Sequence, residues 1–165
     1  MVNRRTLLGT AAAGGTVAAI AAVFGMRTLE AASGAFEVTK TDAEWKRLLT
    51  PAQYYVLREH GTERAGTSPL DREKRKGTFH CAGCDLPLFS SATKYDSGTG
   101  WPSFWQPLAN AVGTSEDSTL FMTRIEVHCR RCGGHLGHVF DDGPAPTGKR
   151  YCMNGVAMTF KAAVA

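Results

Sequence analysis

The sequence predicts a mainly β domain with many turns, and two observations lead to this fold class. Helical spacing of apolar residues is scarce after about residue 60, whereas short stretches of β-branched and aromatic residues recur there. The 165-residue chain also contains 18 glycines, which punctuate these stretches as turns. No linker divides the chain after residue 35, so we expect one domain over residues 36–165.

The N-terminal segment has the pattern of an export signal. Arg4 and Arg5 precede an uncharged run, residues 6–26, that is rich in alanine, glycine and threonine. A twin arginine before such a run resembles a Tat signal, and small residues at 31–35 offer cleavage sites. An uncleaved membrane anchor is the alternative, because the run is long enough to span a bilayer. Its glycine and threonine content disfavours this. We therefore assign residues 1–35 to a Tat-type signal and expect the domain in the periplasm.

Two short helices are predicted at the start of the domain. Thr41 or Asp42 caps the first, and Thr50 caps the second, which begins at Pro51 and ends at Gly61. Both helices are expected to pack against the β structure rather than to carry chemistry.

The rest of the domain divides into predicted strands and turns. The predicted strands are residues 77–80, 119–128 and 150–156. The predicted loops and turns are residues 61–77, 94–100, 114–118 and 141–148.

Four of the five cysteines form two Cys-x-x-Cys pairs. They are Cys81 and Cys84, then Cys129 and Cys132. Each pair can present two thiolates to one ion, and four thiolates complete a tetrahedral zinc site. Disulfides are the alternative in an exported protein, but pairs with this spacing at strand ends favour zinc. With sulfur in all four positions, the zinc would be structural.

Cys152 is left without a partner cysteine, which makes it a candidate reactive thiol. It lies in an alternating run, so Arg150, Cys152 and Asn154 are expected on one face of a strand. A neighbouring guanidinium favours the thiolate, which is the nucleophilic form, and the amide can donate a hydrogen bond. A half-buried structural cysteine is the alternative.

Two histidines and a tryptophan are further candidates. His135 and His138 titrate near neutrality and can supply a proton, and Asp142 can orient one of them. They are poor candidates for metal ligands, because four thiolates already fill a zinc site. Trp101, held between a glycine and a proline, would form a rigid apolar wall; ordinary core packing is the alternative.

Taken together, five motifs in order closely resemble the type-B peptide-methionine sulfoxide reductases, which act on the R epimer. Besides the two cysteine pairs, the motifs are Gly98-Thr99-Gly100-Trp101-Pro102-Ser103-Phe104, His135-Leu136-Gly137-His138-Val139-Phe140 with Asp142-Gly143-Pro144, and Arg150-Tyr151-Cys152-Met153-Asn154. The resemblance covers about residues 40–161. It implies two small antiparallel sheets, short N-terminal helices and a zinc site opposite the active site.

The resemblance also implies roles for individual residues. Cys152 would attack the sulfoxide sulfur, while His138 and His135 would assist protonation and hold the sulfoxide oxygen or a water. Trp101 would receive the terminal methyl group of the substrate. The polar shell would be completed by Arg150, Asp142 and Asn154.

One position departs from a common pattern of that family. Many members carry a resolving cysteine where Thr99 stands. With four cysteines assigned to zinc, none remains to resolve an oxidised Cys152. We therefore expect a sulfenic acid on Cys152 to be reduced directly by an external thiol, either a small molecule or a thioredoxin-like protein. The implied substrates are proteins and peptides bearing methionine R-sulfoxide.

Two other functions compete with this interpretation. A zinc-stapled binding module would use Cys152 only structurally, and a thiol enzyme acting on peroxides would have no need of Trp101. The net charge of +4 is mild, and no basic stripe with interleaved aromatic residues suggests nucleic-acid binding. Nothing in the sequence demands more than a monomer.

Overall fold

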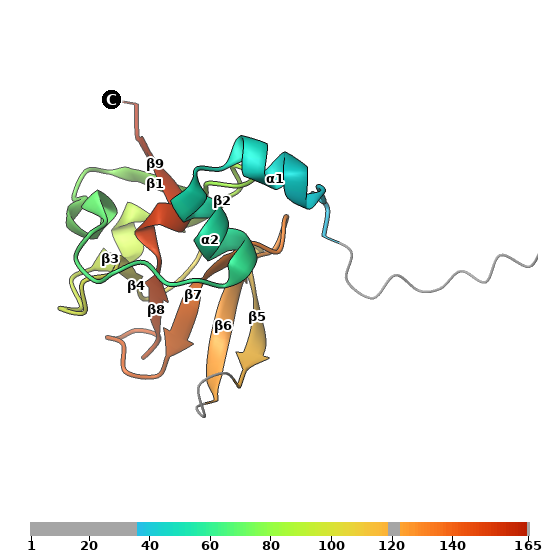
Figure 1. Ribbon diagram of the computed structural model, residues 1–165. Coiled ribbons are helices and arrows are strands. Elements are labelled where there is room, and N and C mark those ends of the chain that lie inside the picture. Colours follow the sequence, from blue (N-terminus) through green and yellow to red (C-terminus); the bar gives the residue numbers. More distant parts are fainter. Residues whose placement is uncertain (1–35, 119–122, 165) are drawn as a thin grey trace, which may run out of the picture. The chain divides into compact units, whose positions relative to one another are not determined.

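The computed structural model describes residues 36–118 and 123–164. Two antiparallel sheets and two short α-helices form the domain (Figure 1), which confirms the predicted mainly β class. The predicted export signal, residues 1–35, lies outside the described residues. Within the described ranges, no helix has the length and apolar character needed to cross a membrane.

Both predicted helices are confirmed at their threonine N-caps, whereas the second ends at His60 rather than at the predicted Gly61. Helix α1 is Asp42–Leu48 and helix α2 is Pro51–Glu59. Each begins with a capping box: the Thr41 and Thr50 hydroxyls accept hydrogen bonds from backbone N–H groups of the first turn. Such a cap stabilises a helix by about 1 kcal/mol. The αL conformation of His60, with φ of 55°, ends α2.

The smaller sheet has the strand order β2-β1-β9, and the larger has β3-β4-β8-β7-β6-β5. The smaller sheet contains β1 (Gly77–Cys81), β2 (Pro87–Ser90) and β9 (Met158–Ala162). The larger contains β3 (Lys94–Tyr95), β4 (Ser103–Phe104), β5 (Val112–Asp117), β6 (Arg124–Cys129), β7 (His135–Phe140) and β8 (Arg150–Met153). The 3₁₀ turns are η1 (Pro69–Arg72), η2 (Ser91–Thr93) and η4 (Gly155–Ala157).

Three phenylalanines join the two sheets. Phe79 of β1 and Phe89 of β2 pack on Phe104 of β4, with ring centroids 4.9 and 4.3 Å away. All three side chains are fully buried, and each buried ring of this size contributes about 1.5–3 kcal/mol. This contact anchors β4, the strand that pairs with the strand of Cys152.

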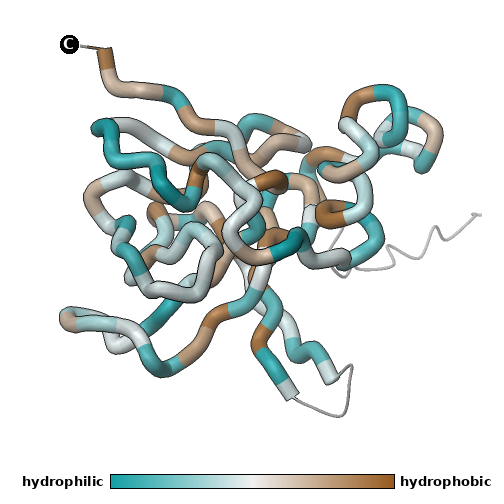
Figure 2. The backbone as a smooth tube through the Cα atoms, turned by 60° about the vertical axis from the view of Figure 1, so that its left-hand side comes forward, coloured by the Kyte–Doolittle hydropathy of each residue, from teal (hydrophilic) through white to brown (hydrophobic). Residues whose placement is uncertain are grey.

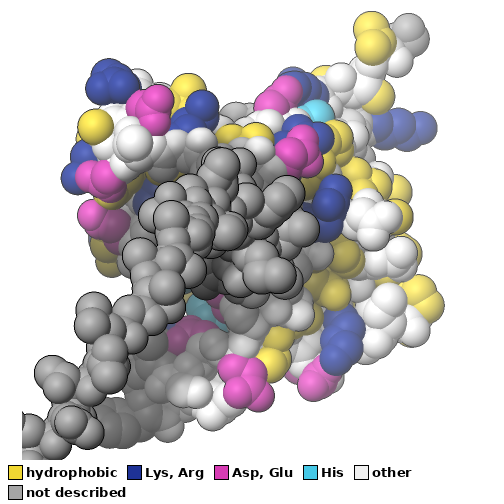
Figure 3. Space-filling model, turned by 90° about the vertical axis from the view of Figure 1, so that its right-hand side faces the viewer, with side chains coloured by type: hydrophobic (Ala, Val, Ile, Leu, Met, Phe, Trp, Pro, Cys, Tyr) yellow, Lys and Arg dark blue, Asp and Glu magenta, His cyan; other side chains and the backbone are white. Residues whose placement is uncertain are grey.

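Polar and apolar residues alternate along the domain rather than forming long apolar runs, as Figure 2 shows. Acidic and basic side chains are interspersed over the described part of the face in Figure 3.

The predicted turn at 114–118 is wrong. Strand β5 runs through it and pairs with β6 from Val112, opposite Cys129, to Asp117, opposite Arg124. Because β5 is an edge strand, its side chains are largely polar and resemble a turn in composition. The predicted strand at 119–128 is confirmed only as β6; residues 119–122 lie outside the described ranges.

Candidate active site and metal centre

Cys152 lies on β8, between β4 and β7 of the larger sheet. Its Cα partners are Ser103 on β4 and His138 on β7. Side chains in such positions share one face of the sheet, with Cβ atoms about 5 Å apart. The sheet therefore places the candidate nucleophile between a hydroxyl group and an imidazole. The sequence predicted the histidine but gave Ser103 no role.

The environment of the Cys152 thiol raises its pKa above the ordinary value, and burial is the main cause. Hydrogen bonds from Thr99, whose Oγ1 lies 3.8 Å from Sγ, and from Ser103 act in the opposite direction, as does the Arg150 guanidinium. The predicted effect of Arg150 is therefore confirmed in direction but is smaller than the effect of burial. The free thiol is the favoured form at neutral pH.

Arg150 is held by Asp142 rather than directed wholly at the thiol. Two parallel hydrogen bonds of 2.8 Å join the guanidinium to the carboxylate, and the guanidinium lies 4.4 Å from the Phe140 ring centroid. Arg150 lowers the pKa of Asp142. The prediction that Asp142 orients a histidine is wrong, because its carboxylate instead orients Arg150.

Asp117 is the carboxylate that contacts His138. The His138 Nε2 atom lies 2.7 Å from Asp117 Oδ2, and Arg124 donates to the same oxygen at 2.7 Å. Burial lowers the pKa of His138, although the Asp117 hydrogen bond opposes this shift. The sequence offered no signal for Asp117, since its segment had the composition of a turn.

Glu126 is the partner of His135. The His135 side chain is buried, and its Nδ1 lies 2.8 Å from Glu126 Oε1. This hydrogen bond is the main cause that lowers the pKa of Glu126 to about 2. The carboxylate is therefore ionised and accepts a hydrogen bond from the Nδ1–H group of His135. The buried Nε2 of His135 has no hydrogen-bond partner in the described part of the chain.

A cavity of about 130 Å³ opens beside the thiol. It is lined by Thr62, Trp101, Arg124, Gly137, His138, Phe140, Cys152 and Asn154. The structure thus brings four predicted site residues, Trp101, His138, Cys152 and Asn154, to one cavity. Asp142, Arg150 and His135 stand outside this lining. The volume equals that of about four waters in the liquid, which suits the tip of a side chain.

Asn154 and Trp101 are fixed by hydrogen bonds to backbone groups. Asn154 Nδ2 donates to the Leu136 carbonyl at 3.0 Å, and its Oδ1 accepts from the Glu63 N–H at 2.9 Å. The indole N–H of Trp101 donates to the Glu63 carbonyl at 3.1 Å. No role was predicted for Glu63, because it lies in the polar segment 61–77, which was interpreted as a loop.

The four paired cysteines meet between two distant hairpin turns. Their sulfur atoms lie within 4.8 Å of one another: Cys81 to Cys132 is 3.7 Å, and Cys84 to Cys129 is 3.5 Å. A tetrahedron with Zn–S bonds of about 2.3 Å has S–S edges of about 3.8 Å. All four cysteines are free. The donor set and spacing therefore fit a tetrahedral metal ion, as predicted.

His60, Glu126 and His135 also bring metal-type ligand atoms within 4.8 Å. Glu126 Oε1 lies 3.1 Å from His60 Nδ1 and 2.8 Å from His135 Nδ1. The carboxylate forms hydrogen bonds with His135 and Ser115 and a close contact with His60, so its oxygens already have partners within the protein.

The fold and site define a class of protein: a mainly β protein with four clustered cysteines that could hold a metal ion and a further cysteine at a cavity lined by a histidine and a tryptophan. The SelR domain matches residues 49–162, and the chain belongs to this family.

Three relatives illustrate the similarity. The chain is 58% identical over 125 residues to the peptide methionine sulfoxide reductase MsrB of Methanosarcina barkeri, which covers 75% of this chain and 88% of that protein. It is 56% identical over 126 residues to MsrB of Agrobacterium fabrum, covering 76% and 93%. It is 53% identical over 126 residues to MsrB of Pseudomonas putida, covering 76% and 95%.

Proposed function

We propose that this protein reduces methionine R-sulfoxide in peptides and proteins to methionine. The observation that carries the proposal is the cross-strand pair of Cys152 and His138 at a small cavity walled by Trp101. Family membership and relatives named peptide methionine sulfoxide reductase support it. The apolar indole face suits the terminal methyl group of the substrate, and the polar residues suit the sulfoxide oxygen.

In the first step, Cys152 removes the oxygen. Its Sγ attacks the sulfoxide sulfur, the sulfur–oxygen bond of the substrate breaks, and the oxygen remains as the hydroxyl of a sulfenic acid on Cys152. The thiol proton is retained in that hydroxyl. The substrate sulfur gains two electrons, and the cysteine sulfur loses two.

Protonation of the sulfoxide oxygen makes the sulfur–oxygen bond easier to break, and in this proposal His138 takes the thiol proton and passes it to that oxygen. Asp117 fixes the ring through Nε2. Burial lowers the pKa of His138, so its protonated form is a stronger acid than an exposed histidine. The buried His135, held by Glu126, supports the same region of the sheet.

The second step returns Cys152 to the thiol by means of an external reductant. Thr99 stands at the position where the family resemblance implies a resolving cysteine, and it presents a hydroxyl 3.8 Å from the sulfur. One external thiol condenses with the sulfenic acid and releases water, and a second thiol breaks the mixed disulfide. The reductant is a small thiol or a thioredoxin-like protein.

We assign zinc to the four-cysteine centre. Cys81 and Cys84 would hold it from one hairpin turn, and Cys129 and Cys132 from the other. Four thiolates leave no open position, so the ion would cross-link the two turns and take no part in the reaction.

The N-terminal residues 1–35 are proposed to direct the protein to the periplasm as a Tat-type signal. The mature protein is proposed to act as a monomer. Intact-mass measurement of protein from the periplasmic fraction tests the first proposal. A measured mass equal to that of the chain starting at Met1 would exclude cleavage and favour the membrane anchor.

The direct test is turnover with dithiothreitol and each epimer of a methionine-sulfoxide peptide. Reduction of the R epimer alone is expected. Turnover of neither epimer by zinc-loaded, folded protein would contradict the proposal and favour a binding module.

A further inference from the structure

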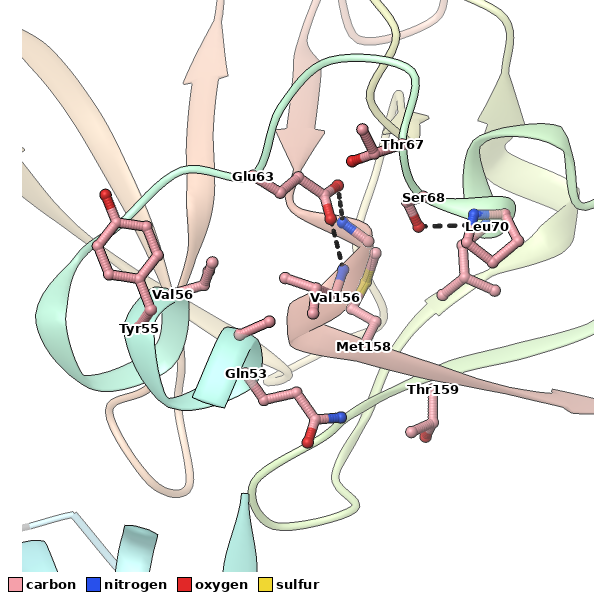
Figure 4. Close-up of a pocket in the computed structure, with 13 residues that line it drawn as sticks. Gln53, Tyr55, Val56, Glu63, Thr67, Ser68, Leu70, Val156, Met158 and Thr159 are labelled. Atoms are coloured by element: carbon pink, nitrogen blue, oxygen red, sulfur yellow. Dashed lines mark hydrogen bonds between the residues drawn. The ribbon is translucent and has the colours of Figure 1, made fainter. Parts of the chain in front are cut away.

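Glu63 connects three parts of the candidate site, although it lies in the segment between α2 and η1. Its backbone N–H donates to Asn154 Oδ1 and its carbonyl accepts from Trp101 Nε1. Its carboxylate accepts from the Gly155 N–H at 2.6 Å and from the Val156 N–H at 2.9 Å. Figure 4 shows the side chain reaching the turn η4, with both carboxylate bonds dashed.

The turn that Glu63 holds directly follows the strand of Cys152. Asn154 alone connects β8, which ends at Met153, to η4, which begins at Gly155, so the position of η4 fixes where Asn154 enters the active-site cavity. Gly155 is closely packed: a Cβ atom there would approach Ser68 Oγ to 1.9 Å. The turn has little room to shift while the carboxylate holds it.

Two separate cavities lie on either side of this part of the chain. Thr62 and Asn154 line the active-site cavity, whereas their neighbours Glu63 and Gly155 line a separate cavity of about 460 Å³. The two cavities share no lining residue. Glu63 and the turn it binds therefore stand between the active site and a second, mainly apolar space.

The carboxylate of Glu63 lies in surroundings that disfavour a charge. Burial raises its pKa, while the hydrogen bonds from Val156 and Gly155 oppose this shift. Its carboxylate forms no ion pair with a basic side chain of the described ranges. Two backbone N–H groups, of Gly155 and Val156, donate hydrogen bonds to it instead, an arrangement that gives strong and directional hydrogen bonds.

We propose that Glu63 is a positioning residue for substrate binding: it fixes Trp101 and Asn154 around Cys152 without touching the substrate. The carboxylate fastens Glu63 to the 155–156 turn, and the Glu63 backbone then holds the indole and the amide. This inference rests on the proposed function.

The test uses Glu63→Ala and Glu63→Gln in the full domain with zinc bound. Glu63→Ala leaves the two N–H groups of the turn without acceptors, and a shift of about 1 Å at a positioned group can reduce activity about 10²-fold. We expect kcat/KM for the R-sulfoxide peptide to fall by about this factor, chiefly through KM. Glu63→Gln keeps one acceptor oxygen, so a smaller loss is expected. Glu59→Gln, on the exposed end of α2, is the matched control and should match the wild type.

A second measurement separates positioning from general loss of structure. Alkylation of Cys152 by iodoacetamide requires neither the Trp101 wall nor Asn154, so its rate should be unchanged in both Glu63 variants. Unchanged KM and kcat, or an equal loss of alkylation and turnover, would overturn the proposal. If the wild type itself gave no turnover, the proposed function would fail instead.

Discussion

Cys152 and His138 are direct cross-strand partners in the larger sheet. Four successive residue pairs join β8 to β7 around this pair, and Cβ atoms in such positions are about 5 Å apart. The hydrogen-bonded backbones of β7 and β8, rather than a loop, therefore keep the sulfur and the imidazole close to each other. The proposed oxygen transfer requires this spacing.

Replacing the imidazole should slow the chemical step. His138→Asn removes the proposed proton donor, so kcat should fall by about 10²- to 10⁴-fold. Asp117→Asn keeps the imidazole but weakens its orientation and should cost less. Steady-state rates with the R-sulfoxide peptide measure both. A His138→Asn protein with the wild-type kcat would show that another group supplies the proton.

The reactivity of the Cys152 thiol should rise with pH over an unusually high range. Burial raises its pKa, so the thiolate forms only as pH rises past the ordinary thiol range. The rate of alkylation by iodoacetamide, followed by mass spectrometry, reports the thiolate fraction. Its midpoint should lie above that of the same cysteine in the unfolded chain.

The Arg150→Ala variant provides the control for this pH dependence. The guanidinium lowers the pKa of Cys152, so its removal should move the alkylation midpoint further upward. A midpoint that moved downward would contradict the assigned electrostatics.

A thiol introduced at position 99 should convert the one-cysteine cycle into a two-cysteine cycle. The Thr99 hydroxyl lies 3.8 Å from the Cys152 sulfur, so Thr99→Cys should condense with the sulfenic acid and form an intramolecular disulfide. Non-reducing peptide mapping after one turnover detects this bond. Thr99→Ser is the matched control and should form none. Without a disulfide in Thr99→Cys, the geometry assigned to position 99 would be wrong.

Loss of the metal centre should destabilise the domain rather than block chemistry directly. The centre closes a loop of 44 residues between Cys84 and Cys129. Such a cross-link stabilises by about 4 kcal/mol on the chain-entropy relation. Cys84→Ser should therefore lower the melting temperature strongly and reduce the zinc content below the proposed one ion per chain. A zinc-free protein that melts like the wild type would remove the structural role.

Local sequence signals predicted the features that depend on local chemistry. The caps at Thr41 and Thr50 set the helix starts, because a side chain there reaches the first turn. The cysteine spacing predicted the clustering of the four cysteines, since each pair can present two sulfur atoms to one ion. Cys152 was distinguished by elimination, after the other four cysteines were paired.

Features that depend on strand register were not predictable. Asp117 and Glu126 reach their histidines across the β5–β6–β7 sheet, and β6 contains a register shift between Val127 and His128 that a single sequence does not reveal. Glu63 was missed for another reason. Two of its contacts are made by backbone atoms, which any residue type supplies.

The central claim is that the oxygen of the substrate moves to Cys152, and a single turnover without reductant tests it most directly. The protein is mixed with excess R-sulfoxide peptide, and both the reduced peptide and the mass of the Cys152 peptide are measured. The account predicts one reduced peptide per chain and a gain of about 16 Da, one oxygen, on Cys152 as sulfenic acid. Cys152→Ser, with zinc and fold intact, should give neither. Stoichiometric reduction by that variant, or oxidation found elsewhere with Cys152 unchanged, would contradict the account.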